Sequence, residues 1–381
     1  MEKNKLLGSL FAPLALFCLA AAPLLAGEGT AGGDFLRIVQ SPRAVGMGEA
    51  GAGGYGDLLG ALSLNPAGLA RSGYKEAAFT YNSWIEGIAS QQAAYAQPLG
   101  PGVIAGAVMA LSVPSIDGYD NSGAYTGQVE AGNLAAGGSY AARVWSPWDD
   151  ARYGLFAGAT LKYARERLGG TSAGAPLADA GVLWIARAGG GTASLGLSGQ
   201  SLGGGFKFDS ETDPAPSVYR AGFSYIVLAA GDPITFSADV RKPDNSGASF
   251  SAGGEYQVWR TLALRAGYVS GQDLGSGLRF GGGVALKLLQ FDYSLSSYGK
   301  FGPAHRFSLS YKFDKPVPVT QHLTVEQEQA RRKGAEARAM MDEKRYYEAV
   351  LLLNDALTLD PGYKEALDLM KKARMLIEGP R

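Results

Sequence analysis

Between residues 76 and 313 the chain repeats one pattern, in which apolar and polar side chains alternate over segments of about ten residues. Because side chains alternate across a β-strand, each segment predicts a strand with one apolar and one polar face. After residue 26, no segment has the roughly 18 uninterrupted apolar residues of a membrane-spanning helix. A strand-built protein is therefore expected. The terminal segment shows the pattern most clearly, and its apolar face carries Phe307, Leu309, Tyr311 and Phe313.

The links between these segments alternate in character along the chain. One set is short, as in VWRT, and the other is mostly longer and polar, as in PSIDGYDNSGAYTG and ERLGGTSAGAP. Outer-membrane barrels have an even strand number, short turns at one end and longer loops at the other, whereas a soluble sandwich gives no reason for this alternation. Residues 75–313 are therefore predicted to form an all-β transmembrane antiparallel barrel of about 14 strands. The predicted strands are 76–84, 90–97, 102–113, 129–145, 152–165, 177–187, 192–201, 217–228, 233–241, 249–257, 260–269, 277–288, 290–297 and 305–313.

The composition agrees with a barrel. The 381 residues include 55 glycines, 19 tyrosines and 15 phenylalanines, and only 18% are charged. Aromatic residues favour strands and the interfacial girdles of membrane proteins. The polar faces are rich in Gly, Ala and Ser, which would leave room for a plug or allow tightly curved walls. The formal net charge is +0, so no basic field indicates a nucleic-acid partner.

Residues 1–26 are typical of a secretory signal peptide. Lys3 and Lys5 precede the apolar run Leu6–Leu25, which two prolines interrupt. An uncleaved membrane anchor is the alternative interpretation. Cys18, the single cysteine, lies within this run, so a cleaved chain would contain neither a disulfide nor a thiolate metal site.

Motifs typical of enzymes are weak in this chain. Gly51–Gly56 matches GxGxxG, but no buried strand precedes it and no acidic residue follows at the spacing of a dinucleotide site. Ser297–Lys300 matches SxxK without its companion motifs. His305 and His322 lie in unrelated contexts, and no metal-ligand spacing occurs. We therefore expect a protein that is not an enzyme and has no cofactor or metal.

The block before the first strand, residues 27–74, is predicted to be a plug segment. Within its LSLNPAGLA stretch, Asn65 suits the N-cap and Pro66 the first position of a helix. The pair is therefore predicted to begin a short helix and not to interrupt one. Glycines upstream would allow tight turns in a crowded lumen. The predicted plug motif comprises Arg43, Gly46, Met47, Gly48, Asn65, Pro66, Ala67, Gly68 and Leu69.

A charged tail follows the last predicted strand. A proline-containing linker, residues 314–325, leads to three predicted helices at Glu326–Met341, Tyr346–Leu359 and Tyr363–Ile377. The second helix resembles the second half of a tetratricopeptide repeat (TPR). Because one repeat cannot bury its own hydrophobic face, the tail, residues 326–381, is expected to contact the barrel rim, to pair with a partner, or to be only marginally stable. The predicted TPR-like packing residues are Ala349, Leu353, Ala356 and Pro361.

The N-terminal block resembles the PorV/PorQ family of outer-membrane proteins. The resemblance rests on RAVGMGEA (43–50), NPAGLA (65–70) and Phe79–Trp84, and it extends over residues 35–313 as barrel architecture. This family is similar in outline to the FadL transporters of hydrophobic compounds, which share the fourteen-strand barrel and an N-terminal plug with an NPA-type motif. The resemblance implies a bacterial outer-membrane protein in contact with lipid, with its tail in the periplasm. The helical tail departs from the plain family pattern.

Two functions follow from the resemblance. In the first, the protein is a PorV-like component of protein secretion or cell-surface attachment, and residues 326–381 recruit periplasmic or secretion-complex partners. In the second, it is a FadL-like passive route for hydrophobic small molecules, with a hydrophobic ligand in the barrel and a gating plug. The N-terminal block favours the first. A barrel whose tail only anchors it to other envelope components stays open as a third interpretation.

Overall fold

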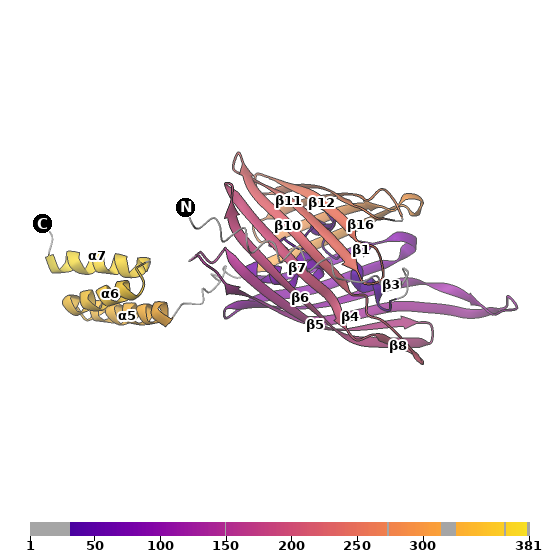
Figure 1. Cartoon of the computed structure of the whole chain (residues 1–381), viewed down its shortest axis with the longest axis horizontal. Helices are drawn as coiled ribbons and strands as arrows, with labels where there is room; N and C mark the ends of the chain where they lie inside the picture. The colour runs from indigo at the N-terminus through magenta and orange to yellow at the C-terminus, as the bar shows by residue number, and fades with distance from the viewer. Residues whose placement is uncertain (1–30, 149, 273, 314–324, 362, 379–381) are drawn as a thin grey trace. The chain divides into compact units, whose positions relative to one another are not determined.

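The computed structural model describes residues 31–381 except 149, 273, 314–324, 362 and 379–381 (Figure 1). The chain divides into two compact units, Met1–Thr320 and Gln321–Arg381. The first contains the strands and the second contains three helices. The predicted signal peptide and almost all of the predicted linker lie outside the described residues.

Fourteen antiparallel strands form one closed barrel. The last strand pairs with the first in a continuous register from Lys75 opposite Phe313 to Ser83 opposite His305, and this pairing closes the sheet. The predicted barrel and its strand number are confirmed. In barrel order the strands are β1 (Lys75–Ser83), β2 (Ala89–Leu99), β3 (Gly102–Tyr119), β4 (Tyr125–Trp145), β5 (Gly154–Leu168), β6 (Thr171–Ala188), β7 (Gly191–Gly203), β10 (Val218–Ala229), β11 (Asp232–Pro243), β12 (Ser249–Val258), β13 (Leu262–Val269), β14 (Leu278–Leu286), β15 (Leu289–Ser297) and β16 (Pro303–Phe313).

The connections differ between the two ends of the barrel. At the end where β1 begins and β16 ends, which we call the short-turn end, most turns are short, such as residues 100–101 between β2 and β3. The opposite end, the long-link end, carries the longest connection, residues 204–217. That connection contains a small hairpin of β8 (Phe206–Phe208) and β9 (Glu211–Asp213).

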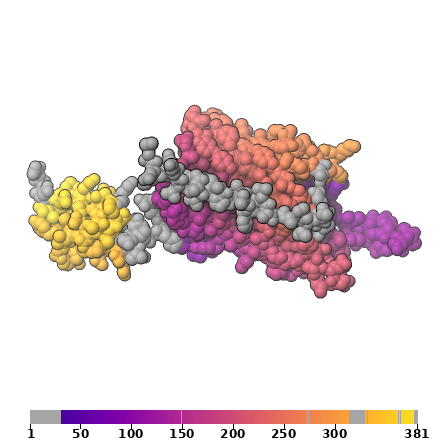
Figure 2. Space-filling model, in the orientation of Figure 1, coloured from indigo at the N-terminus to yellow at the C-terminus, as the bar shows by residue number. Residues whose placement is uncertain are grey.

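Two links that were predicted to be long are mostly strand. β3 continues to Tyr119 and β4 begins at Tyr125, so PSIDGYDNSGAYTG is largely a hairpin that projects from the long-link end (Figure 1). Figure 2 shows this hairpin in purple as a narrow projection. Only residues 169–170 join β5 to β6, where ERLGGTSAGAP predicted a loop. In the projecting hairpin most side chains on both faces are exposed, so apolar and polar residues do not alternate there.

The barrel wall is apolar outside and polar inside. On β11, Phe236 is 54% exposed and Val240 50%, whereas Asp239 between them is 1% exposed. The same alternation follows β1, β15 and β16, where buried residues include Thr80, Ser294 and Ser308. A soluble sandwich would bury its apolar faces instead. A closed barrel with an apolar outer face is the arrangement that spans a bilayer.

The second unit consists of α5 (Val325–Asp342), α6 (Tyr346–Leu359) and α7 (Lys364–Glu378). The predicted helical appendage is thus present, and its helix boundaries agree closely with the prediction. Ala349, Leu353 and Ala356 are buried at its core, and Pro361 follows α6 at the surface. In the described part of the chain, no helix combines the length and the apolarity needed to cross a bilayer. The tetratricopeptide assignment stays a prediction.

Candidate functional site

Residues 31–74 lie inside the barrel, as the plug prediction expected, and we call them the plug (Figure 1). The plug starts near the long-link end, where the Gly33 amide donates to Glu166 Oε2 at 2.7 Å. It ends at the short-turn end, where β1 begins. Its described helices are η2 (Asp34–Arg37), α3 (Pro42–Gly46), α4 (Leu58–Leu64) and η3 (Pro66–Arg71).

Asn65 joins two of these helices. Its Oδ1 accepts the Ala67 amide at 3.1 Å and caps η3, so the Asn-Pro pair begins a helix as predicted. The expectation that no helix is already running at this pair was wrong, because α4 ends at Leu64, directly before Asn65. The Asn65 side chain also donates to the Ala52 carbonyl at 2.7 Å and to the Val182 carbonyl of β6 at 3.1 Å. Asn65 therefore fixes the plug to itself and to the wall.

Glycines on the wall let the plug backbone approach it closely. A Cβ on Gly196 of β7 would overlap the Ala52 carbonyl, and a Cβ on Gly253 of β12 would overlap the Met47 carbonyl. The plug backbone therefore occupies the space that side chains would need at these positions, which explains much of the glycine on the inner face. Further seats of this kind are Gly158 against Pro66, Gly181 against Asn65, and Gly267 against Gly48.

A buried charge network attaches α3 to the wall. Arg43 donates two hydrogen bonds to Glu255 of β12, Nε to Oε2 at 2.8 Å and Nη2 to Oε1 at 2.7 Å. Glu255 also accepts from Arg265 of β13 at 2.6 Å, and Arg265 donates to Asp292 of β15 at 2.6 Å. Two arginines and two carboxylates thus balance one another. Burial acts to lower the pKa of Arg43, but the Glu255 carboxylate raises it above the ordinary value, so Arg43 stays charged.

A second attachment holds the glycine-rich turn of the plug. Asp239 Oδ2 on β11 accepts the amides of Gly51 and Ala52 at 2.9 and 2.8 Å. On β7, the Ser194 hydroxyl donates to the Gly53 carbonyl at 2.6 Å. The stretch that matches GxGxxG therefore directs backbone amides at a wall carboxylate, and those amides are not left open for a phosphate.

One cavity lies between the plug and the wall formed by β2 to β7. It holds about 580 Å³ of free space, including the part open to solvent. Leu36, Ile38 and Met109 contribute apolar lining. They belong to, or pack against, a hydrophobic cluster that also contains Phe35 and Phe206. The rest of the lining is polar and includes Gln92, Gln200 and the ion pair between Lys162 and Asp179 at 2.7 Å. We call it the upper cavity.

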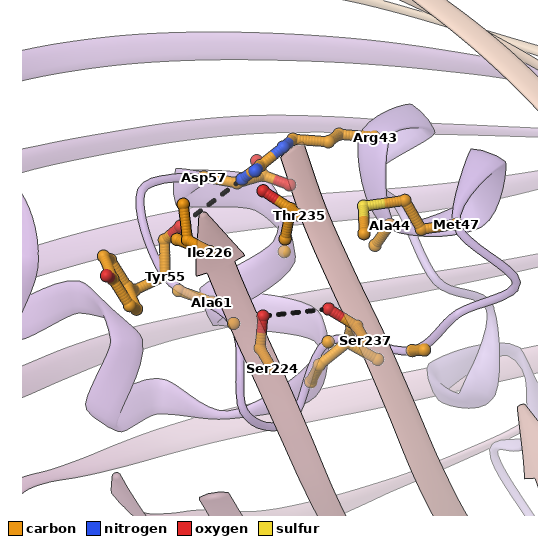
Figure 3. Close-up of a pocket in the computed structure, with 15 residues that line it drawn as sticks. Arg43, Ala44, Met47, Tyr55, Asp57, Ala61, Ser224, Ile226, Thr235 and Ser237 are labelled. Atoms are coloured by element: carbon orange, nitrogen blue, oxygen red, sulfur yellow. Dashed lines mark hydrogen bonds between the residues drawn. The ribbon is translucent and has the colours of Figure 1, made fainter. Parts of the chain in front are cut away.

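A second cavity lies between the plug and the ends of β10 and β11 at the short-turn end (Figure 3). It holds about 460 Å³ of free space, counted in the same way. Arg43 Nη1 donates to the Tyr55 carbonyl at 3.3 Å along its edge, and the Ser237 hydroxyl donates to Ser224 Oγ at 3.0 Å on its wall. We call it the lower cavity.

Helix α4 separates the two cavities. Gly60, Ala61 and Leu64 line the lower cavity, whereas Leu62 and Ser63 line the upper one. The cavities have no lining residue in common. α4 therefore contributes lining residues to both cavities.

The predicted plug-motif residues fall into two separate contacts. Arg43, Gly46, Met47 and Gly48 pack against β12 to β15, whereas Asn65–Leu69 packs against β4 to β6. The predicted terminal-strand residues face outward. The sequence analysis missed α4 and the buried charged groups around Arg43. Each of those groups is a single charged residue in a strand with no other distinguishing pattern. Among the described residues, no group of three or more His, Cys, Asp or Glu side chains is placed to hold a metal ion.

The fold and its lumen define a plugged β-barrel of the membrane-spanning kind. No protein-family model matches the chain, and no curated protein matches it in sequence. Similar solved structures include the toluene transporter TodX of Pseudomonas putida, with 12% identity, a TM-score of 0.49, and coverage of 73% of this chain and 100% of that one. The monoaromatic hydrocarbon channel CymD shows 14% identity, a TM-score of 0.47, and coverage of 77% and 100%. These likenesses assign no family, and the resemblance to PorV/PorQ stays a prediction.

Proposed function

We propose that this protein is a bacterial outer-membrane barrel that gives small, mainly apolar molecules a passive route across the membrane, gated by α4 of the plug. The observation that carries the proposal is the pair of cavities divided by α4. The apolar outer face supports a location in lipid. The apolar part of the upper cavity supports a ligand with little charge.

Side-chain hydrogen bonds attach α4 to other parts of the chain near its two ends. At its C-terminus, the Ser198 hydroxyl donates to the Leu64 carbonyl at 2.6 Å, and Gln200 donates to the Ser63 carbonyl. At its N-terminus, the Ser41 hydroxyl donates to the Asp57 carboxylate. These neutral donors are weaker than the bidentate charged pair that holds α3. In the proposed gate α4 moves and its buried leucines, such as Leu59 and Leu64, give up part of their packing, while the Arg43 network keeps the plug in the lumen.

Uptake of a fluorescent apolar probe tests the route. Cells that express the full chain are mixed with N-phenylnaphthylamine, and the rate of the fluorescence rise is compared with that of cells lacking the protein. Ala135→Phe fills the upper cavity, because Ala135 is buried and lines it. Ala159→Phe adds the same ring to the exposed outer face.

The route predicts that expression raises the uptake rate, that Ala135→Phe removes most of the gain, and that Ala159→Phe keeps it. Equal rates for the parent chain and Ala135→Phe, at equal amounts of folded barrel, would rule out passage through the upper cavity.

A second pair of variants addresses the gate. Cysteines at Ser63 and Gln200, oxidised to a disulfide, should lower uptake until a reductant is added.

A role in protein secretion or cell-surface attachment is the second candidate. The observation that favours it is the separate helical unit, on which Tyr347 is 73% and Leu351 69% exposed one turn apart on α6. Exposed apolar side chains of this kind suit a protein partner. Copurification of envelope proteins with the full chain, lost on deletion of residues 320–381, would support this role. An unchanged set of copurified proteins would count against it.

A further inference from the structure

Two buried arginines in the lumen have no carboxylate partner among the described residues. Arg279 of β14 is 1% exposed and Arg306 of β16 is 2% exposed. No carboxylate of a described residue forms an ion pair with either. By contrast, Arg265 has two carboxylate partners, and Arg220 on β10 interacts electrostatically with Arg241 and also with the carboxylates of Glu49 and Asp239. Burying a guanidinium without a counter-charge is costly, because the charge loses its hydration and gains no partner.

The two arginines come together at the level of Ser296 on the strand between them. Ser296 is paired directly with Arg279 across β14 and β15. Arg306 Nη1 donates to Ser296 Oγ at 3.2 Å. Both arginines therefore lie beside Ser296 on the wall, where the Arg279 guanidinium donates to Gln272 Oε1 at 2.6 Å and to the Leu278 carbonyl at 3.1 Å. That point lies just inside the long-link end, because Ser297 ends β15 there and Pro303 begins β16.

Several buried polar atoms at this point have no hydrogen-bond partner. They include the Nε atoms of Arg279 and Arg306, the indole Nε1 of Trp84 and the Ser294 hydroxyl. The neighbouring ring of Tyr298 lies 5.3 Å under the Arg279 guanidinium and packs edge-on against Trp84 at 6.1 Å. Guanidinium, indole and hydroxyl groups can all donate hydrogen bonds. The set therefore offers several unpaired donors, two of them on positively charged groups, to one acceptor.

We propose that Arg279 and Arg306 form a binding site for an oxyanion, a carboxylate or phosphate group, just inside the long-link end of the lumen. Arg279 and Arg306 supply the charge, and Trp84 and Ser294 supply further donors. The site does not depend on the proposed transport route. It lies on β14 to β16 and beside Trp84 after β1, whereas the wall of the upper cavity is formed by β2 to β7 and shares none of these residues. The anion could arrive as a free ion or as the head group of an anionic lipid.

Calorimetric titration of the purified full chain in a non-ionic detergent tests the site. The titrants, at fixed sodium chloride, are inorganic phosphate, acetate, and a short-chain phosphatidic acid below its micelle concentration. The variants are Arg279→Gln, Arg306→Gln and their combination. Arg220→Gln is the matched control, since Arg220 is also buried in the lumen with an unpartnered Nη1 but lies on β10, away from the proposed site. Folding of each variant is checked by its heat-dependent migration on a gel.

We expect saturable binding of at least one titrant to the parent chain, weakened about tenfold or more by the combined variant and unchanged by Arg220→Gln. Binding of the phosphatidic acid alone would assign the site to a lipid head group, and binding of phosphate or acetate would assign it to a soluble anion. If the combined variant does not fold, Arg306→Gln should weaken binding and Arg306→Lys should restore much of it. An absence of saturable binding to the parent chain, which is the result expected if water alone fills the site, would overturn the proposal. Equal affinities for the parent and Arg306→Gln would do the same.

Discussion

The barrel unit and the helical unit bury opposite kinds of side chain. The barrel encloses polar and charged groups such as Arg265 and Glu255 and exposes rings such as Phe236. The helical unit encloses Leu353 and several alanines, and its ion pairs lie at the surface, as between Arg345 and Glu343. The difference shows that the two units face different solvents. An apolar outer face is stable in lipid, whereas in water the folded state is stabilised by burying apolar side chains in a core.

The interiors of the two units also differ in which part of the chain fills them. The helical unit fills its core with side chains from its own helices, whereas the barrel is filled by a separate segment of chain, the plug. Plug backbone needs hydrogen-bond partners wherever it is buried, so the wall offers carboxylates, hydroxyls and glycines. A polar lumen is therefore what a plugged barrel requires, whether or not it conducts.

The largest expected effect comes from a charge inside the barrel. Glu255→Ala leaves Arg43 and Arg265 without the carboxylate they share, and it should destabilise the seated plug by about 3–5 kcal/mol. Urea unfolding in detergent micelles measures the loss. Gln257→Ala removes only one neutral donor to Glu255 and should lower the stability by about 1 kcal/mol. Equal losses for the two variants would mean that the network does not hold the plug.

The matching test in the helical unit removes an apolar side chain. Leu353→Ala opens a cavity in a core where Leu353 is 0% exposed, and it should destabilise that unit by about 3 kcal/mol. Hydrogen exchange resolved by peptide should show faster exchange in α5 to α7 and no change in β1 to β16. Faster exchange throughout the barrel would contradict the division into two units.

The same substitution on the two outer surfaces sharpens the comparison. Phe236→Arg places a charge on the apolar outer face and should lower barrel stability by about 2 kcal/mol. Tyr347→Arg changes an even more exposed ring on α6 and should alter stability by less than about 0.5 kcal/mol. Folding titrations into lipid vesicles measure both changes. A harmless Phe236→Arg would mean that this face does not contact lipid.

The smallest effect is expected at the short-turn end, in the link after β4. Hydrogen bonds from the Arg152 side chain lower the pKa of Asp150 to about 2, below its ordinary value of 3.8. Because the pKa of Asp150 is lower in the folded protein, its ionised carboxylate stabilises the folded link at pH values above the ordinary pKa. This contribution is lost as the pH falls from about 4 to about 2. Because Asp150 is exposed to solvent, Asp150→Asn should cost less than about 0.5 kcal/mol at pH 7. Proteolysis of the link as a function of pH should show no change between pH 7 and 5, and cleavage that increases within that range would contradict the prediction.

The sequence predicted the strands well where lipid and lumen act on opposite faces. On β11 and β16 the alternation of Ile234 to Arg241 and of Arg306 to Phe313 follows directly from that contrast. It failed between Ser115 and Gly127, because the projecting hairpin has water on both sides and its residues carry no alternation. The helices of the second unit were predictable because apolar residues recur at helical spacing and Pro or Gly follows the second and third helices.

The plug was predictable as a segment but not in its contacts. α4 was missed because LLGALSL is short and contains Gly60, which weakens its helix signal. Arg43 was identified as part of a motif, but its partner Glu255 is 212 residues away. Nothing local distinguishes that glutamate from other polar residues of the inner face. Such long-range pairing depends on barrel register, which a single sequence does not supply.

Spin-label accessibility along β11 tests most directly whether the barrel wall is apolar outside and polar inside. Cys18 is replaced by serine, and single cysteines are placed in turn at residues 234 to 241, labelled, and reconstituted in lipid vesicles. Collision with oxygen, which concentrates in lipid, should be high at positions 234, 236, 238 and 240. It should be low at positions 235, 237 and 239, where the plug and lumen shield the label. The reverse alternation, or equal access of a water-soluble relaxant to all eight positions, would contradict a plugged barrel in a membrane.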